Sequence, residues 1–259
     1  MVRPLIAVWL VGQLTMREAL RSRLLWIGAA FALLLAGLSV AAASVAAAEQ
    51  VRLIVDVGLA AQSALGSVAA VALGVGLFGV HLQTRCADAF LVRPLPRWAY
   101  LAGRAAGLGV ALAALVGSMA LCTAALVWVF GGSLPGAYWV QLGLSAIEVC
   151  MVLCLTLLFC TFCSPQAAAI YSSMVLLCGR LSGELAVLAD RSHAPLAHRA
   201  LRLAYAVLPD LSCLSLRGAA ANGVAWSTEL ALGGACYGIL YALASLFLAM
   251  FIFERRRSL

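Results

Sequence analysis

Apolar residues occur along this chain in long blocks, separated by short segments that are polar or contain proline or glycine. Six blocks are long enough for a helix to cross the hydrocarbon core of a bilayer, which takes about 20 apolar residues. They predict six membrane-spanning helices, at residues 24–47, 57–81, 105–130, 137–162, 165–189 and 230–253. The expected fold is therefore an all-α membrane protein with a single domain over residues 1–259.

The separating segments have the composition of turns and helix ends. Polar residues at 49–56 divide the first two blocks. The sequence GGSLPG at 131–136 predicts a tight turn between the third and fourth helices. Ser164 and Pro165 predict a break before the fifth helix, because proline starts a helix readily but cannot continue one.

Two further amphipathic segments flank the spans. Residues 4–22, within the N-terminal segment 1–23, predict a helix on the membrane surface with Trp9 as an anchor at the headgroups. Charged residues rather than a small-residue cleavage site follow it, so a cleaved signal is not expected. An uncleaved anchor helix is the alternative. In the outer loop 190–229, apolar residues at helical spacing before Pro209 favour a short interfacial helix, with an ordinary ordered loop as the alternative.

Composition identifies the solvent of this chain as lipid. The 259 residues are 65% hydrophobic and 10% charged, with a mean hydropathy of +1.06, whereas soluble domains average about 25% charged residues. All 17 basic residues are arginine. Because a P-loop needs a lysine to reach the phosphates of ATP, this chain by itself is not expected to hydrolyse ATP.

The placement of the arginines predicts the orientation. Eleven of them precede the first span, lie between the second and third spans, or follow the sixth. The other six fall on the opposite side. Since cytoplasmic loops are enriched in arginine, both termini are expected to face the cytoplasm of a multi-pass inner-membrane protein, with the segment 82–104 as the main cytoplasmic loop and 230–259 as the sixth span and basic tail.

That cytoplasmic loop carries a family resemblance. The sequence LVRPLPRWAYLAGRAAGL at 91–108 resembles the loop between spans two and three of ABC-2 type transporter permeases. Five further segments are similar to that family in the same order. They are REALRSRLLW at 17–26, EQVRLIVDVGLAAQSALG at 49–66, FCTFCSPQAAAI at 159–170, VLPDLSCLSLRG at 207–218 and the tail FIFERRRSL. The resemblance is to the branch often described as linked to multi-copper enzyme maturation.

The resemblance implies an architecture and a set of partners. The architecture is the six-span ABC-2 permease, similar to type V exporters, with an N-terminal interfacial helix. Such permeases pair with a second copy or a paralogue and work with separate ATPase subunits, which bind ATP and Mg while the permease binds no cofactor. Export is favoured over import. The basic outer loop could meet either a periplasmic accessory protein or an anionic substrate, and the sequence does not decide between them. Nucleic-acid binding is not expected.

The resemblance also assigns the loop a coupling role toward the ATPase. The residues expected to carry it are Arg85, Asp88, Phe90, Leu91 and Arg93. Asp88 is the one acidic residue left where the family carries several. The alternative is that these arginines only obey the positive-inside rule.

The residues themselves favour a stiff loop. A helix from about 84 to 91 must end before Arg93, because a residue that precedes proline avoids the helical region. Two prolines then stiffen the connection, and Arg97, Trp98 and Tyr100 are expected to anchor the third span at the headgroups.

Glu148 lies about halfway along the predicted fourth span, where an ionised carboxylate is costly. It is expected to line a translocation path or a dimer interface, near Ser118 or Thr123 of the third span. The alternative is a neutral, hydrogen-bonded packing residue. Near the outer end of the fifth span, Arg180 and Glu184 have the i,i+4 spacing of an ion pair.

Neither metal binding nor catalysis is predicted. Most of the nine cysteines lie within apolar spans, where packing is favoured over a Cu(I) path. No nucleophile and base can be paired at membrane depth, so no catalytic residue is expected. The rival functions are a proton-coupled secondary carrier that uses Glu148 without an ATPase, and a membrane scaffold.

Overall fold

The computed structural model describes residues 4–21, 47–83, 97–182, 209–218 and 227–255, with scattered helical positions between Trp26 and Gly37. The helices are α1 (Pro4–Arg21), α3 (Ala47–Leu73), the π-helix η1 (Gly74–Gly79), α4 (Val80–Gln83), α6 (Arg97–Val129), α7 (Gly136–Phe162), α8 (Pro165–Arg180), the 3-10 turn η2 (Ser212–Leu214) and α12 (Thr228–Arg255). Over the described residues the fold is all-helical, as predicted.

Among the described residues, four helices are long and apolar enough to cross a membrane. They run over Val51–Leu82, Trp98–Val129, Gly136–Phe162 and Thr228–Arg255 within the described residues. These helices indicate a membrane protein. The predicted first span, 24–47, lies mostly outside the described residues. The first part of the predicted fifth span corresponds to α8, which has 16 residues, and residues 183–189 of that prediction lie outside the described residues.

Local signals placed several helix ends correctly. α7 and α12 occupy the predicted fourth and sixth spans to within two residues. The GGSLPG turn follows α6, and Gly131 there has a φ of 69°, which glycine adopts without steric cost. Ser164 caps α8, and its hydroxyl oxygen accepts from the backbone N–H of Ala167 at 3.4 Å.

Two predicted helix starts were wrong. The polar residues at 49–56 do not precede the second predicted helix but belong to α3, which begins at Ala47. These residues fit a helix that extends beyond the apolar core. Arg52 is exposed there, and Asp56 pairs with Arg217 at 3.0 Å. α6 begins at Arg97, eight residues before the predicted start, directly after Pro96.

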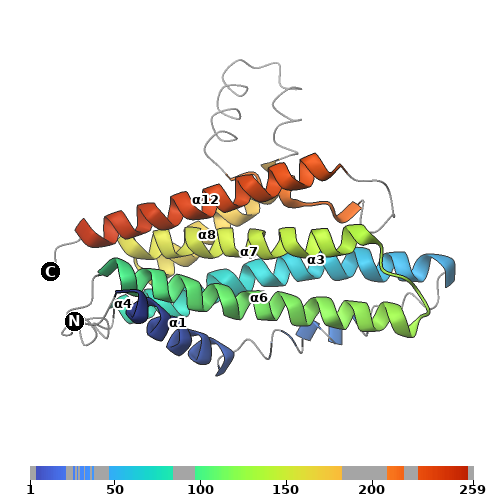
Figure 1. The fold of residues 1–259 in the computed structure, drawn as a ribbon, viewed down its shortest axis with the longest axis horizontal. Helices are drawn as coiled ribbons and strands as arrows, with labels where there is room; N and C mark the ends of the chain where they lie inside the picture. Colours follow the sequence, from blue (N-terminus) through green and yellow to red (C-terminus); the bar gives the residue numbers. More distant parts are fainter. Residues whose placement is uncertain are drawn as a thin grey trace, which may run out of the picture.

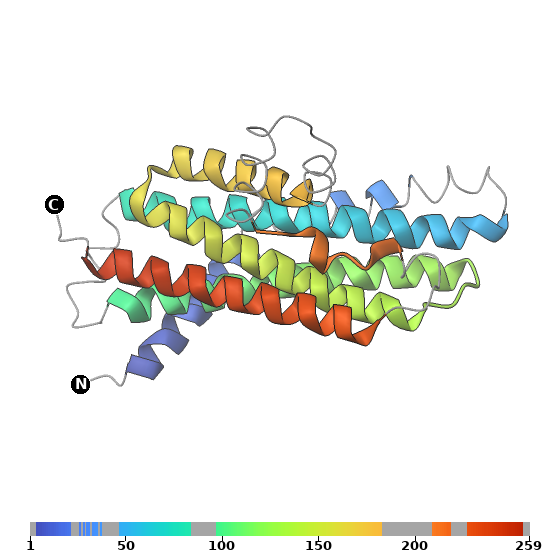
Figure 2. The ribbon, with the colours of Figure 1, turned by 90° about the horizontal axis from the view of Figure 1, so that it is seen from above.

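α7 is the central helix of the bundle. It packs against α3, α6, α8 and α12, and Figures 1 and 2 show it between them. In its most apolar window 61% of the residues are buried, compared with 22% for α12. Much of α12 is therefore left for lipid or a partner. The start of α1 and the end of α12 lie at the same end of the bundle (Figure 1).

Glycines allow the close contacts of α3 and η1 with α7. A Cβ added at Gly66 would lie 2.9 Å from Val149, and one at Gly74 would lie 2.9 Å from Thr156. Small residues at such positions let helices approach closely in a membrane.

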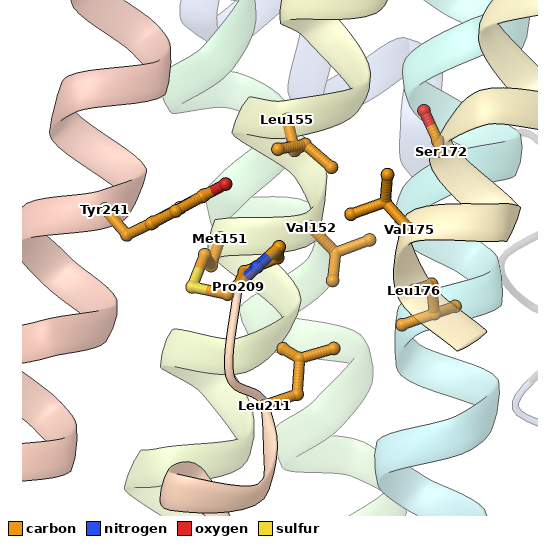
Figure 3. Close-up of a pocket in the computed structure, with 9 residues that line it drawn as sticks. All are labelled: Met151, Val152, Leu155, Ser172, Val175, Leu176, Pro209, Leu211 and Tyr241. Atoms are coloured by element: carbon orange, nitrogen blue, oxygen red, sulfur yellow. The ribbon is translucent and has the colours of Figure 1, made fainter. Parts of the chain in front are cut away.

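The segment 209–218 packs back into the bundle. Figure 3 shows Pro209 and Leu211 among side chains of α7 and α8. The backbone N–H of Leu211 donates to the carbonyl of Gly179 at 3.1 Å, and Leu214 is fully buried. This segment covers the end of α8. The interfacial helix predicted before Pro209 lies outside the described residues.

Candidate functional site

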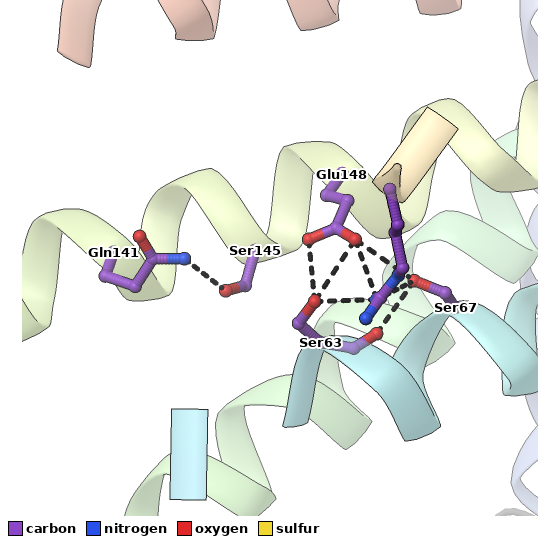
Figure 4. Close-up of polar contacts among 6 residues, drawn as sticks. Ser63, Ser67, Gln141, Ser145 and Glu148 are labelled. Atoms are coloured by element: carbon purple, nitrogen blue, oxygen red, sulfur yellow. Dashed lines mark hydrogen bonds and ion pairs between the residues drawn. The ribbon is translucent and has the colours of Figure 1, made fainter. Parts of the chain in front are cut away.

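A buried polar network joins α3, α7 and α8 around Glu148. The residue is 5% exposed, and its Oε1 lies 2.9 Å from Nη2 of Arg180. The Ser63 hydroxyl donates to Oε2 at 2.9 Å, and the Ser67 hydroxyl lies 3.4 Å from Oε1. Figure 4 shows both serines directed at the carboxylate. The carboxylate is thus compensated by a cation and a hydrogen-bond donor rather than left unpaired.

Arg180 lies at the centre of this network. Its Nη2 also contacts the hydroxyls of Ser63 at 2.7 Å and Ser67 at 3.2 Å. The guanidinium of Arg180 turns into the bundle toward α7. Glu184 lies outside the described residues, so its i,i+4 pairing with Arg180 stays a prediction. The carboxylate of Glu148 is nearly excluded from water, which strengthens its electrostatic attraction to the guanidinium.

The structure does not bring Ser118 or Thr123 into this network. Each donates to a backbone carbonyl of its own helix, Ser118 to Leu115 at 2.7 Å and Thr123 to Met119 at 3.1 Å. Thr123 is buried and packs against Gly58 of α3. The polar partners of Glu148 come from α3 and α8 and not from α6.

The network has no net charge and connects α8 to α3 and α7, and we call it the tether. One carboxylate and one guanidinium cancel, and the two serines supply hydrogen bonds that a buried pair needs in order to balance its desolvation. It holds α8 against α3 and α7, and any movement of α8 away from α7 must break it. No metal-binding group of three or more His, Cys, Asp or Glu side chains occurs in the described part of the chain.

A second ionic cluster lies at the base of the predicted coupling loop. The candidates Arg85, Asp88, Phe90, Leu91 and Arg93 all lie outside the described residues. The helices that lead into and out of the loop are described, and Glu18 of α1 contacts both. Its Oε2 accepts from Arg104 of α6 at 2.9 Å, and its Oε1 lies 3.5 Å from Nε2 of His81 in α4.

The α1 and α6 helices that carry this cluster are in close contact. Gly103 and Gly107 of α6 face Val11 and Gly12 of α1, and a Cβ at Gly103 would lie 2.8 Å from the Cβ of Val11. The hydroxyl of Thr15 on the same face of α1 is used within the helix, since it donates to Val11 at 2.8 Å. The outgoing end of the loop therefore rests on two helices packed backbone to backbone.

The predicted interfacial anchors differ in their placement. Trp9 is 61% exposed and Trp98 is 36% exposed, as residues at a lipid interface can be. Tyr100 is buried, and its hydroxyl accepts from Nε of Arg104 at 3.3 Å, so its ring packs inside the bundle. Arg97 is the first residue of α6, and its side chain lies outside the described part of the chain.

Asp210 organises the segment that covers α8. It accepts from Ser182 at 2.6 Å and from the backbone N–H of Ser212 at 2.9 Å. Cys213 also donates to it at 3.0 Å. Burial, and then the hydrogen bond and negative charge of Asp210, raise the pKa of Cys213 to about 11. These groups satisfy one another, and the thiol stays protonated at neutral pH.

The residues that pair in the two clusters were not predicted from the sequence. Ser63 and Ser67 did carry a signal, because polar residues four apart share one face of an apolar helix. Glu18 and Arg104 carried none, since they are 86 positions apart and each occurs in a polar segment that topology alone explains.

Comparison with models of protein families and with curated protein sequences finds no match for this chain.

Proposed function

We propose that this chain is the membrane-spanning permease subunit of an ATP-binding cassette transporter of the ABC-2 type. It pairs with a second copy or a paralogue in the inner membrane, and a separate ATPase subunit binds ATP and Mg. The loop that includes Arg85, Asp88, Phe90, Leu91 and Arg93 contacts that ATPase. The proposed direction is export.

The proposal rests on the contacts of Glu18 with the two helices that flank the loop. Force applied to residues 84–96 reaches the bundle through α4 and α6, and Glu18 contacts a residue of each. Arg104 is only 5% exposed, and its ion pair and the close α1–α6 packing leave the start of α6 little freedom to move separately. A displacement of the loop by the ATPase would therefore move α6 as well, instead of deforming only the loop.

The network around Glu148 supports the same function inside the helix bundle, away from the coupling loop. α8 lies against α3 and α7, and the tether provides a defined arrangement that a conformational change would have to break. An ion-paired carboxylate with two serine partners is a poor proton carrier, so the arrangement favours a movable helix contact over a proton-coupled carrier.

The proposal is tested by purifying the chain from native membranes in a mild detergent, with mass spectrometry of the proteins that remain bound. We expect an ATPase subunit in near-equal amount, and ATP hydrolysis by the complex. Asp88→Ala and Phe90→Ala should release that subunit, whereas Arg52→Gln, an exposed substitution at the far end of α3, should retain it. Recovery of the chain without any ATPase would refute the proposal.

A further inference from the structure

An open groove lies beside the last turns of α7 and α12. It has a volume of about 410 Å³ and is lined by Thr161, Phe162, Phe251, Ile252 and Arg255. The two phenylalanine side chains are each about half exposed, and Ile252 is partly buried. The groove therefore offers an apolar wall next to the guanidinium of Arg255.

α12 is long enough to bring Arg255 to the membrane surface. Its 28 residues extend about 42 Å, compared with roughly 30 Å for the hydrocarbon core of a bilayer. The charged residues of this helix occupy only its ends, with Glu229 in the first turn and Glu254 and Arg255 in the last. A span placed symmetrically in the bilayer therefore has its last turn among the lipid headgroups.

The guanidinium of Arg255 is oriented but has no acidic partner. Its Cζ lies 4.2 Å from the centroid of the Phe251 ring, a contact that favours one placement of the cation. Within the described part of the chain, neither Glu254 nor any other carboxylate pairs with it. A guanidinium carries five N–H donors and keeps its charge, so Arg255 can donate to an acceptor that the described residues do not supply.

We propose that this groove binds an anionic phospholipid, whose phosphate accepts from Arg255 and whose acyl chain lies against the phenylalanines and Ile252. Guanidinium and phosphate match in charge and in geometry. A soluble phosphate ion would use only the cation, whereas a phospholipid uses the cation and the apolar wall together. Lipid is also the solvent around α12, since only 22% of its most apolar window is buried. Lipid binding of this kind needs no ATPase, so it stands apart from the proposed function.

The test is native mass spectrometry of the full chain in a mild detergent, titrated with phosphatidylglycerol or phosphatidylcholine of identical acyl chains. We expect phosphatidylglycerol to bind more tightly. Arg255→Gln should weaken its binding about fivefold, the usual contribution of one arginine near an anionic membrane surface. Phosphatidylcholine should be affected less, because its choline offsets the phosphate charge. Arg255→Lys, which keeps the charge but not the planar fork, should lie between the wild type and Arg255→Gln.

Matched variants separate the cation from the apolar wall. Arg217→Gln removes an arginine that already pairs with Asp56 at 3.0 Å, and it should bind both lipids as the wild type does. Leu243→Ala alters a second groove between α7 and α12, which is lined by no charged residue, and should keep the preference for phosphatidylglycerol. Phe251→Ala removes part of the apolar wall and should weaken the binding of both lipids.

The assignment is overturned if Arg255→Gln keeps the wild-type preference for phosphatidylglycerol. It is also overturned if excess inorganic phosphate displaces the lipid, because the site then binds an anion alone. Lipid that is bound by the single chain but lost from a pair of chains would show that a second copy covers the groove, which would overturn it too. Arg255 is exposed in the last turn of α12, so its variants do not test folding instead of binding.

Discussion

Glu148 and Arg180 form an ion pair whose two ends differ in exposure. The Glu148 side chain is 7% exposed and that of Arg180 is 32% exposed. Loss of the arginine would leave a carboxylate with no counter-charge in a nearly dry environment. Loss of the carboxylate would leave a guanidinium that still reaches solvent. The two ends of the pair should therefore respond unequally to neutral substitutions.

We expect Arg180→Gln to lower the free energy of unfolding by about 3–5 kcal/mol, because it strands a buried charge. Glu148→Gln should cost about 1–2 kcal/mol, since the amide retains hydrogen bonds to the serines. Denaturant unfolding in detergent measures both effects. The double variant should cost less than the sum.

The matched control is Arg217→Gln, which breaks a 3.0 Å pair whose side chains are 47% and 40% exposed. An exposed pair contributes at most about 1 kcal/mol. Equal losses in Arg217→Gln and Arg180→Gln would contradict the account of Glu148 as a buried, compensated charge.

At the scale of elements, α1 and α6 approach each other through glycines. A Cβ at Gly107 would overlap the carbonyl oxygen of Gly12 and lie 2.9 Å from the Cβ of Thr15. Both obstacles belong to the helix opposite and cannot rotate away. Ten residues further along α6, a Cβ at Gly117 would meet nothing within 4 Å.

Gly107→Ala should therefore push α1 off α6 and destabilise the protein by about 1–3 kcal/mol, the usual cost of overpacking. Gly117→Ala should be neutral or stabilising by about 0.5–1 kcal/mol, because alanine is the better helix former. Thermal unfolding in detergent compares the two. A Gly107→Ala variant as stable as Gly117→Ala would show that α1 is not packed as described.

At the scale of the whole molecule, the described helices separate two sets of charged residues. α4, the start of α6 and the end of α12 lie at one end of the bundle (Figure 1), and Glu18 pairs there with His81 of α4 and Arg104 of α6. Asp56, which pairs with Arg217, belongs to the first part of α3, toward the other end. The positive-inside rule predicts that the first end is cytoplasmic.

This orientation can be tested with single cysteines in a background that lacks the native ones. We expect Arg217→Cys to react with a membrane-impermeant maleimide added to intact cells or spheroplasts. Arg17→Cys, exposed on α1, should react only after permeabilisation. The reverse pattern would place both termini outside and exclude contact between the loop and a cytoplasmic ATPase.

The features that the sequence predicted correctly are those with local causes. The extents of α7 and α12 follow from unbroken apolar blocks, and the α7–α8 junction follows from a serine cap and a proline. Each of these signals acts within one or two helical turns, so a single chain segment contains all the information. The start of α3 was missed because a polar stretch ends an apolar block without ending a helix.

Only the tertiary structure decided which side chains meet. Arg180 has Glu148 as its partner because α8 lies beside α7, and Glu18 meets both His81 and Arg104 because α1 packs across α6. Tyr100 looked like a surface anchor, but its hydroxyl lies beside the buried Arg104. The sequence by itself therefore determined a helical membrane protein and most of its helices, whereas the pairing of charges depended on helix packing between residues far apart in the chain.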